Sequence, residues 1–263
     1  MDAAISLTSV LKRDRTVVVL SLSAVALLAW VFTFTQARQM AQMDQGMPGC
    51  TMPSMLAWHP SEFIAVFVMW MVMMAAMMLP SVAPMALTFA FVNRQRREKQ
   101  NPFVPTWIFL CGYMAVWTAF SLLATAVQWY LHQKALVSPM MVSTSPLLSG
   151  GLLILTGIFQ LTPLKNTCLT HCRTPLNFLM TDWGEGQRGA FWMGLRHGVY
   201  CTGCCWVLMM LLFALGVMNL FWIAVISIFV LLEKIAPKPF RLSFISGFLL
   251  IGWGWWLIVG NVK

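Results

Sequence analysis

Long apolar segments constrain this chain more than any other feature of its sequence. Of its 263 residues, 59% are hydrophobic and only 10% are charged, and the mean hydropathy is +0.76. A soluble domain of this size carries more charge, whereas about 20 apolar residues in a helix cross the hydrocarbon core of a bilayer. The sequence therefore predicts an all-α fold: a polytopic transmembrane helical bundle, formed as a single domain over residues 1–263 and surrounded by lipid.

The hydropathy pattern predicts about seven membrane spans. Their approximate ranges are 16–36, 62–92, 104–131, 147–163, 190–217, 219–234 and 241–260. Thirteen of the 17 lysines and arginines flank these spans on one side, and three lie on the other. Because cytoplasmic loops carry an excess of Lys and Arg, we expect a cytoplasmic N-terminus and a periplasmic C-terminus. This asymmetry accounts for the net charge of +9, so we expect no nucleic-acid partner.

The span over 190–217 contains a cluster of soft metal ligands. The four side chains fall within nine positions: His197, Cys201, Cys204 and Cys205. At about 100° per residue they share one helix face, which Met193 joins. Ionisable groups inside a membrane usually serve a function, although small cysteines can also simply pack between helices. We predict that this face forms one wall of a metal site or a thiol-redox site.

The second predicted span is rich in methionine. Met69, Met73 and Met77 share one stripe of the helix, and Met74 and Met78 share an adjacent one. Methionine is also a common apolar filler, but the depth of these residues in the bilayer favours a role as metal ligands. At 1.5 Å per residue, Met73 and Cys201 lie about 17 to 18 Å from the ends of their spans. We therefore expect methionine ligands and the Cys/His face to meet near the middle of the bilayer.

Two predicted loops contain further soft ligands. Met47, Cys50 and Met52 lie in the loop before the second span, where methionine either binds a metal or anchors the loop on the bilayer surface. Thioethers favour Cu(I). On the cytoplasmic side, Cys168 and Cys172 are four residues apart, and a short helix would place both thiols on one side. Together with His171 they suit metal hand-off or transient redox chemistry, because cytosolic thiols are kept reduced.

Several signatures are missing from the sequence. It has no phosphate-binding glycine loop, no phosphorylated-aspartate motif of an ion pump and no Ser-His-Asp arrangement. No Asp or Glu lies at the centre of a predicted span, which disfavours transport of hard metals and carboxylate-driven proton coupling. We therefore name no catalytic or cofactor-binding residue, and the sequence favours a non-enzymatic function.

Four stretches resemble a bacterial domain-of-unknown-function family described as predicted metal-binding integral membrane proteins. They are MWMVMMAAMMLPSVAPM (69–85), CGYMAVWTAFS (111–121), QLTPLKNTCLTHCRTPLNFL (160–179) and GLRHGVYCTGCCWVLMMLLFALGVMNLFW (194–222), the last followed by Glu-Lys at 233–234. The resemblance covers most of the chain from the second span onward. It implies metal binding.

The first functional hypothesis is a bacterial inner-membrane protein that binds Cu(I), with Zn as another possible ion. It would transport the ion or deliver it to a soluble metal chaperone or cuproprotein, either as a monomer or as an oligomer. The second is a membrane thiol–disulfide oxidoreductase with Cys201/Cys204 and Cys168/Cys172 as its exchanging pairs. The third is an assembly subunit whose Met and Cys side chains merely pack.

Overall fold

The computed structural model describes residues 2–46, 60–98, 104–134, 136, 145–236 and 239–260. Within these ranges the chain forms helices and no strands, which confirms the predicted all-α fold. The helices are α1 (Asp2–Gly46), α2 (Pro60–Glu98), α3 (Thr106–Gln133), α4 (Pro146–Leu161), α5 (Pro163–Arg173), α6 (Pro175–Thr181), α7 (Gly186–Met210), α8 (Leu212–Leu215), α9 (Leu220–Ile235) and α10 (Pro239–Gly260).

Five described segments are long and apolar enough to cross a membrane. They are Thr16–Gln39, Pro60–Arg96, Thr106–Gln133, Gly186–Leu215 and Arg241–Gly260. Helices α4 and α5 together add a sixth if the bent pair counts as one span. The predicted span over 219–234 forms α9, which has only 16 residues. The number of spans therefore stays a prediction, as does the side of the membrane on which each end lies.

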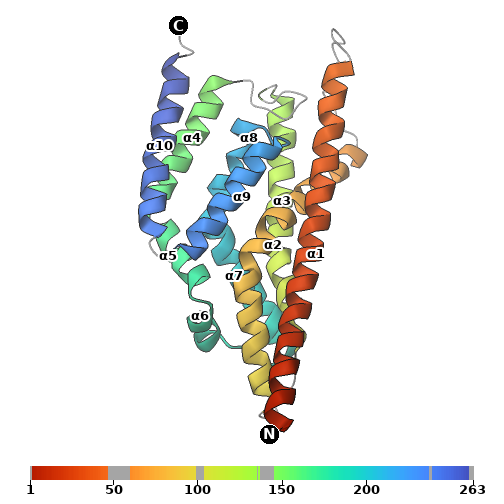
Figure 1. Ribbon diagram of the computed structural model, residues 1–263. Helices are drawn as coiled ribbons and strands as arrows, with labels where there is room; N and C mark the ends of the chain where they lie inside the picture. Colours follow the sequence, from red (N-terminus) through yellow and green to blue (C-terminus); the bar gives the residue numbers. More distant parts are fainter. Residues whose placement is uncertain are drawn as a thin grey trace.

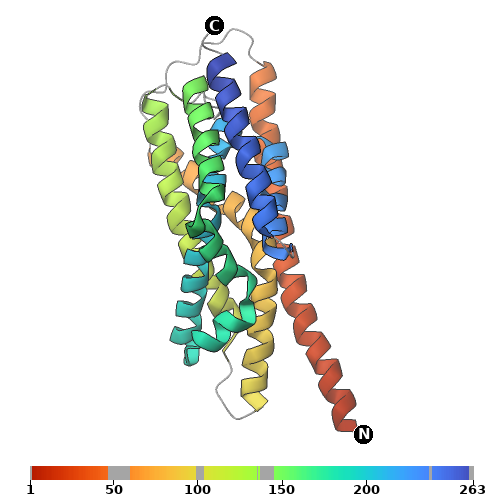
Figure 2. The same cartoon turned by 90° about the vertical axis from the view of Figure 1, so that its left-hand side faces the viewer.

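The bundle is built from pairs of long helices (Figure 1). Helix α4 packs along α10, α3 packs along α7, and α2 lies between α1 and α3. The short helix α5 packs against α7, and α9 contacts α2, α5 and α10. Helix α1 begins at one end of the molecule and α10 ends at the other (Figures 1 and 2).

Glycines allow helices α3 and α7 to approach closely. A Cβ atom on Gly194 would overlap the carbonyl oxygen of Phe109, and one on Gly112 would overlap that of Phe191. Small residues at a helix interface let two backbones come into direct contact. This contact fixes the register between the two helices and brings Tyr113 of α3 level with Cys201 of α7.

Helices α4 and α5 meet at a bend of 65°. Thr162 ends α4, and its Oγ1 accepts a hydrogen bond from the backbone nitrogen of Lys165 at 3.4 Å. Pro163 then takes the first position of α5, where its missing N–H costs nothing. The bend turns α5 toward α7. Part of the stretch expected to be a cytoplasmic loop is therefore a helix packed into the bundle.

Candidate functional site

Helix α7 carries its Cys/His face into the interior of the protein. The side chains of His197, Cys201, Cys204, Cys205 and Met193 are each at most 2% exposed. Their spacing places them on one side of the helix. This face is therefore covered by neighbouring helices, and the groups that contact it decide what it can bind.

Cys201 is the centre of these contacts. Its sulfur lies 3.1 Å from the hydroxyl oxygen of Tyr113 and 3.0 Å from Nζ of Lys234. The same ammonium group donates a hydrogen bond to Oγ of Ser81 at 2.9 Å. Residues of α3 and α9 thus converge on one thiol of α7, and Ser81 of α2 is linked to it through Lys234.

Cys172 joins this group from helix α5. Its thiol lies within hydrogen-bonding reach of the thiols of Cys201 and Cys204. The thiols of Cys204 and Cys205 each donate to the backbone oxygen of Cys201 at 3.0 Å. We refer to these four cysteines as the thiol cluster. The sequence predicts that Cys172 belongs to a separate group of ligands in a cytoplasmic loop, but the bend before α5 brings it into contact with the α7 thiols.

Cys168 and His171 lie at the edge of the thiol cluster. Cys168 is half-buried, and a Cβ atom on Gly203 would lie 3.0 Å from its sulfur. The ring of His171 stacks on Tyr200, with 4.3 Å between the ring centroids, and its Nδ1 contacts the backbone oxygen of Thr167. Both residues are partly accessible, in contrast to the four buried thiols.

His197 is enclosed by aromatic rings. The centroids of Phe178, Tyr113 and Phe109 lie 5.6, 5.9 and 6.1 Å from that of its imidazole. Its Nδ1 atom is buried and has no hydrogen-bond partner among the residues that the structure describes. Because buried polar atoms are normally paired, this nitrogen is an exception, and a role as a metal ligand would explain it.

The two methionine stripes of α2 are buried in the core that also contains the thiol cluster. Met69, Met73 and Met77 belong to the same continuous core as the cysteines. Two side chains connect Cys201 to α2. Lys234 donates a hydrogen bond to Ser81, and Tyr113 donates one to the backbone oxygen of Met78 at 3.4 Å. The sulfur of Met78 lies 3.8 Å from Oγ of Ser81. Met78, from the adjacent stripe, is thus linked to the thiol cluster through Ser81 and Tyr113, and the meeting of Met73 with Cys201 stays a prediction.

The donors of the cluster fit a soft monovalent ion in type. Within the described ranges, no three His, Cys, Asp or Glu side chains are already arranged so that they could hold a metal. Two of the thiols point at a backbone carbonyl instead, and rotation about a single bond turns a cysteine side chain to another staggered position. Thiolate and thioether ligands favour Cu(I), and the unpartnered nitrogen of His197 adds a third kind of donor. Met47, Cys50 and Met52 lie outside the described residues.

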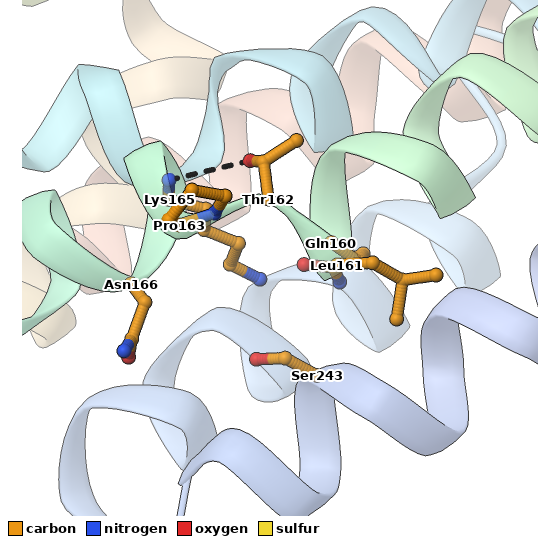
Figure 3. Close-up of a pocket in the computed structure, with 7 residues that line it drawn as sticks. All are labelled: Gln160, Leu161, Thr162, Pro163, Lys165, Asn166 and Ser243. Carbon is orange, nitrogen blue, oxygen red and sulfur yellow. Dashed lines mark hydrogen bonds between the residues drawn. The ribbon is translucent and has the colours of Figure 1, made fainter.

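A cavity of about 180 Å³ lies at the bend between α4 and α5. Gln160, Lys165 and Ser243 point toward one another there, from α4, α5 and α10 (Figure 3). Lys165 pairs with Glu233 at 2.5 Å, and Glu233 also accepts a hydrogen bond from Ser243 at 2.7 Å. The lysine is 1% exposed and the glutamate 2%. This ion pair ties α5 to α9 and α10.

Fold and donors together define an all-helical protein whose long apolar helices surround a cluster of thiols. The model of a family named PpoB2, copper chaperone, matches residues 67–257. The chain therefore belongs to this copper chaperone family. The match includes every residue of the thiol cluster. Comparisons with curated proteins and with solved structures give no match.

Sequence reasoning missed the partners of the thiols. Charge asymmetry predicts that Lys165 and Lys234 are among the thirteen cytoplasmic charges, but Lys234 contacts Cys201 and Lys165 forms a buried ion pair with Glu233. One feature of the sequence could have indicated these contacts. Glu233 and Lys234 lie near the end of a short apolar helix, and a charge buried there needs a partner. Nothing local in the sequence points to Tyr113 as a neighbour of Cys201, or to Ser81 as a neighbour of Lys234.

Proposed function

We propose that this protein binds Cu(I) at the thiol cluster and passes it on, within the bacterial inner membrane. Cys201, Cys204 and Cys172 are the proposed ligands, with Cys205, His197 and Met78 as additional donors at the same level. The observation that carries this proposal is the convergence of thiols from two helices in a member of a copper chaperone family. Five apolar segments of sufficient length support the membrane location.

The proposed route runs from the edge of the protein to its interior. Cys168 and His171 are partly accessible and would exchange the ion with a soluble metal chaperone or a cuproprotein. Cys168 approaches the backbone of α7 at Gly203, next to Cys204. An ion can therefore move between thiols without release into the apolar interior. On the other side of the membrane, the ion would be collected by Met47, Cys50 and Met52. The buried face of α2 would offer it the thioethers of Met69, Met73 and Met77.

Metal analysis tests the binding proposal. The full chain, purified in mild detergent and loaded anaerobically with Cu(I), is compared with the variant Cys201→Ser/Cys204→Ser. Cys111→Ser is the matched control, because this cysteine is exposed and lies outside the thiol cluster. We expect copper to be lost from the double variant and retained by the control. Equal copper in all three proteins would refute the binding site.

A thiol–disulfide oxidoreductase is the second candidate. The contact of Cys172 with Cys201 and Cys204 favours it, because a disulfide between α5 and α7 needs adjacent thiols. The exchanging pairs would then differ from the Cys201/Cys204 and Cys168/Cys172 pairs suggested by sequence spacing. Rapid alkylation of growing cells separates the two functions: an oxidoreductase cycles through an oxidised form, whereas a copper-binding protein keeps these thiols reduced.

A further inference from the structure

The ammonium group of Lys234 lies beside the thiol cluster, and among the described residues no carboxylate forms an ion pair with it. The neighbouring carboxylate, that of Glu233, is engaged by Lys165 and Ser243. Lys234 instead donates to the sulfur of Cys201 and to the hydroxyl of Ser81. The Lys234 side chain is partly buried, and one of its two partners is the sulfur that we propose as a metal ligand.

We infer that Lys234 makes the thiol cluster selective for monovalent over divalent metal ions. This inference rests on the proposed function, because it concerns an ion bound at Cys201. A metal–thiolate bond is about 2.3 Å long, and Nζ of Lys234 lies 3.0 Å from the same sulfur. A metal bound there lies within roughly 5 Å of the ammonium group. Coulomb repulsion at that range is strong in a protein interior and twice as large for a divalent ion.

This cluster needs such a device because four cysteines are also the ligands of many zinc sites. Ligand softness alone separates Cu(I) from Zn(II) only partly, since both bind thiolates. A fixed positive charge beside the ligands disfavours Zn(II) more than Cu(I) or Ag(I). Lys234 would thus act as a specificity-determining residue without itself being a ligand.

Competition titrations test the inference on the full-length protein in detergent under anaerobic conditions. Affinities for Cu(I) and Zn(II) are measured against calibrated chelators for the wild type, Lys234→Met and Lys234→Arg. Ser81→Ala is the control, because it removes a hydrogen bond of the ammonium group and leaves the charge. We expect Lys234→Met to shift the affinity ratio toward Zn(II) by roughly tenfold or more. The arginine and alanine variants should keep the wild-type ratio.

The outcomes distinguish this inference from the proposed function. If the wild type binds neither ion, the binding proposal fails and the inference falls with it. If the wild type binds Cu(I) and the ratio is the same in Lys234→Met, only the inference is overturned. A shift of equal size in Lys234→Arg would also overturn it, because shape rather than charge would then be responsible. Should the methionine variant not fold, judged by gel filtration, Lys234→Gln provides the same comparison.

Discussion

Glu233 and Lys234 are consecutive residues whose side chains contact two different clusters. The carboxylate of Glu233 pairs with Lys165 beside the cavity at the α4–α5 bend. The ammonium group of Lys234 contacts Cys201 in the thiol cluster. The last turn of α9 therefore links the thiol cluster to the ion pair beside the cavity. A change at Glu233 should affect the ion pair, and a change at Lys234 should affect the thiol cluster.

Breaking the buried ion pair should destabilise the fold. In Lys165→Met the carboxylate of Glu233 stays buried without its counter-charge, and such a loss costs about 3 kcal/mol or more. Thermal unfolding in detergent measures the effect. The double variant Lys165→Met/Glu233→Leu should recover most of the lost stability, because no unpaired charge remains. A double variant as unstable as the single one would contradict this account.

Widening the α3–α7 interface should disturb the thiol cluster. In Gly194→Ala the new methyl group overlaps the carbonyl oxygen of Phe109, and overpacking typically costs about 1 to 3 kcal/mol. Gly151→Ala is the matched control, because a Cβ atom there meets no other atom within 4 Å. We expect a lower melting temperature and less bound copper only in the α7 variant. Copper retention equal to that of the control would show that the register of these helices does not matter for binding.

Removing the thiol at the edge should slow transfer without abolishing binding. Cys168 is half-buried and lies outside the set of four mutually close thiols. For Cys168→Ser we expect unchanged copper content and slower removal of copper by an added chelator, followed by stopped-flow absorbance. Cys172→Ser, by contrast, should lower the affinity itself. Equal transfer rates in wild type and Cys168→Ser would remove Cys168 from the proposed route.

Mild oxidation should join α5 to α7. Because the Cys172 thiol contacts those of Cys201 and Cys204, a disulfide formed by an added oxidant should link 172 to one of these two. Peptide mapping by mass spectrometry identifies the pair, and prior loading with Cu(I) should protect it. A disulfide between Cys168 and Cys172 as the main product would contradict the position of α5 against α7.

Local patterns in the sequence were sufficient to predict the helical fold and the chemistry of one helix face. Apolar length and composition specify long helices whatever the neighbours are. Helical periodicity likewise put His197, Cys201 and Cys204 on one face, which the structure buries. The association with copper, first suggested by thiols and thioethers, agrees with the family to which the chain belongs.

The partners of that face depended on tertiary structure. The approach of Cys172 follows from a 65° bend at Thr162 and Pro163, and spacing along the chain cannot specify how such a bend directs the next helix. The meeting of Met73 with Cys201 stays a prediction. The described hydrogen bonds that link α2 to Cys201 run through Tyr113 of α3 and Lys234 of α9, and they reach α2 at Met78 and Ser81.

The bend before α5 also has a consequence for when the thiol cluster is formed. Cys172 and Cys201 are brought together only after α4, α5 and α7 have taken their places. A partly inserted or partly folded chain therefore presents scattered thiols rather than a site. A ligand that binds only the finished arrangement stabilises it in proportion to its concentration relative to the dissociation constant. If copper is that ligand, as we propose, its binding would mark the completion of assembly. A chain in which α5 is not packed against α7 would lack the complete site and would not bind the ion.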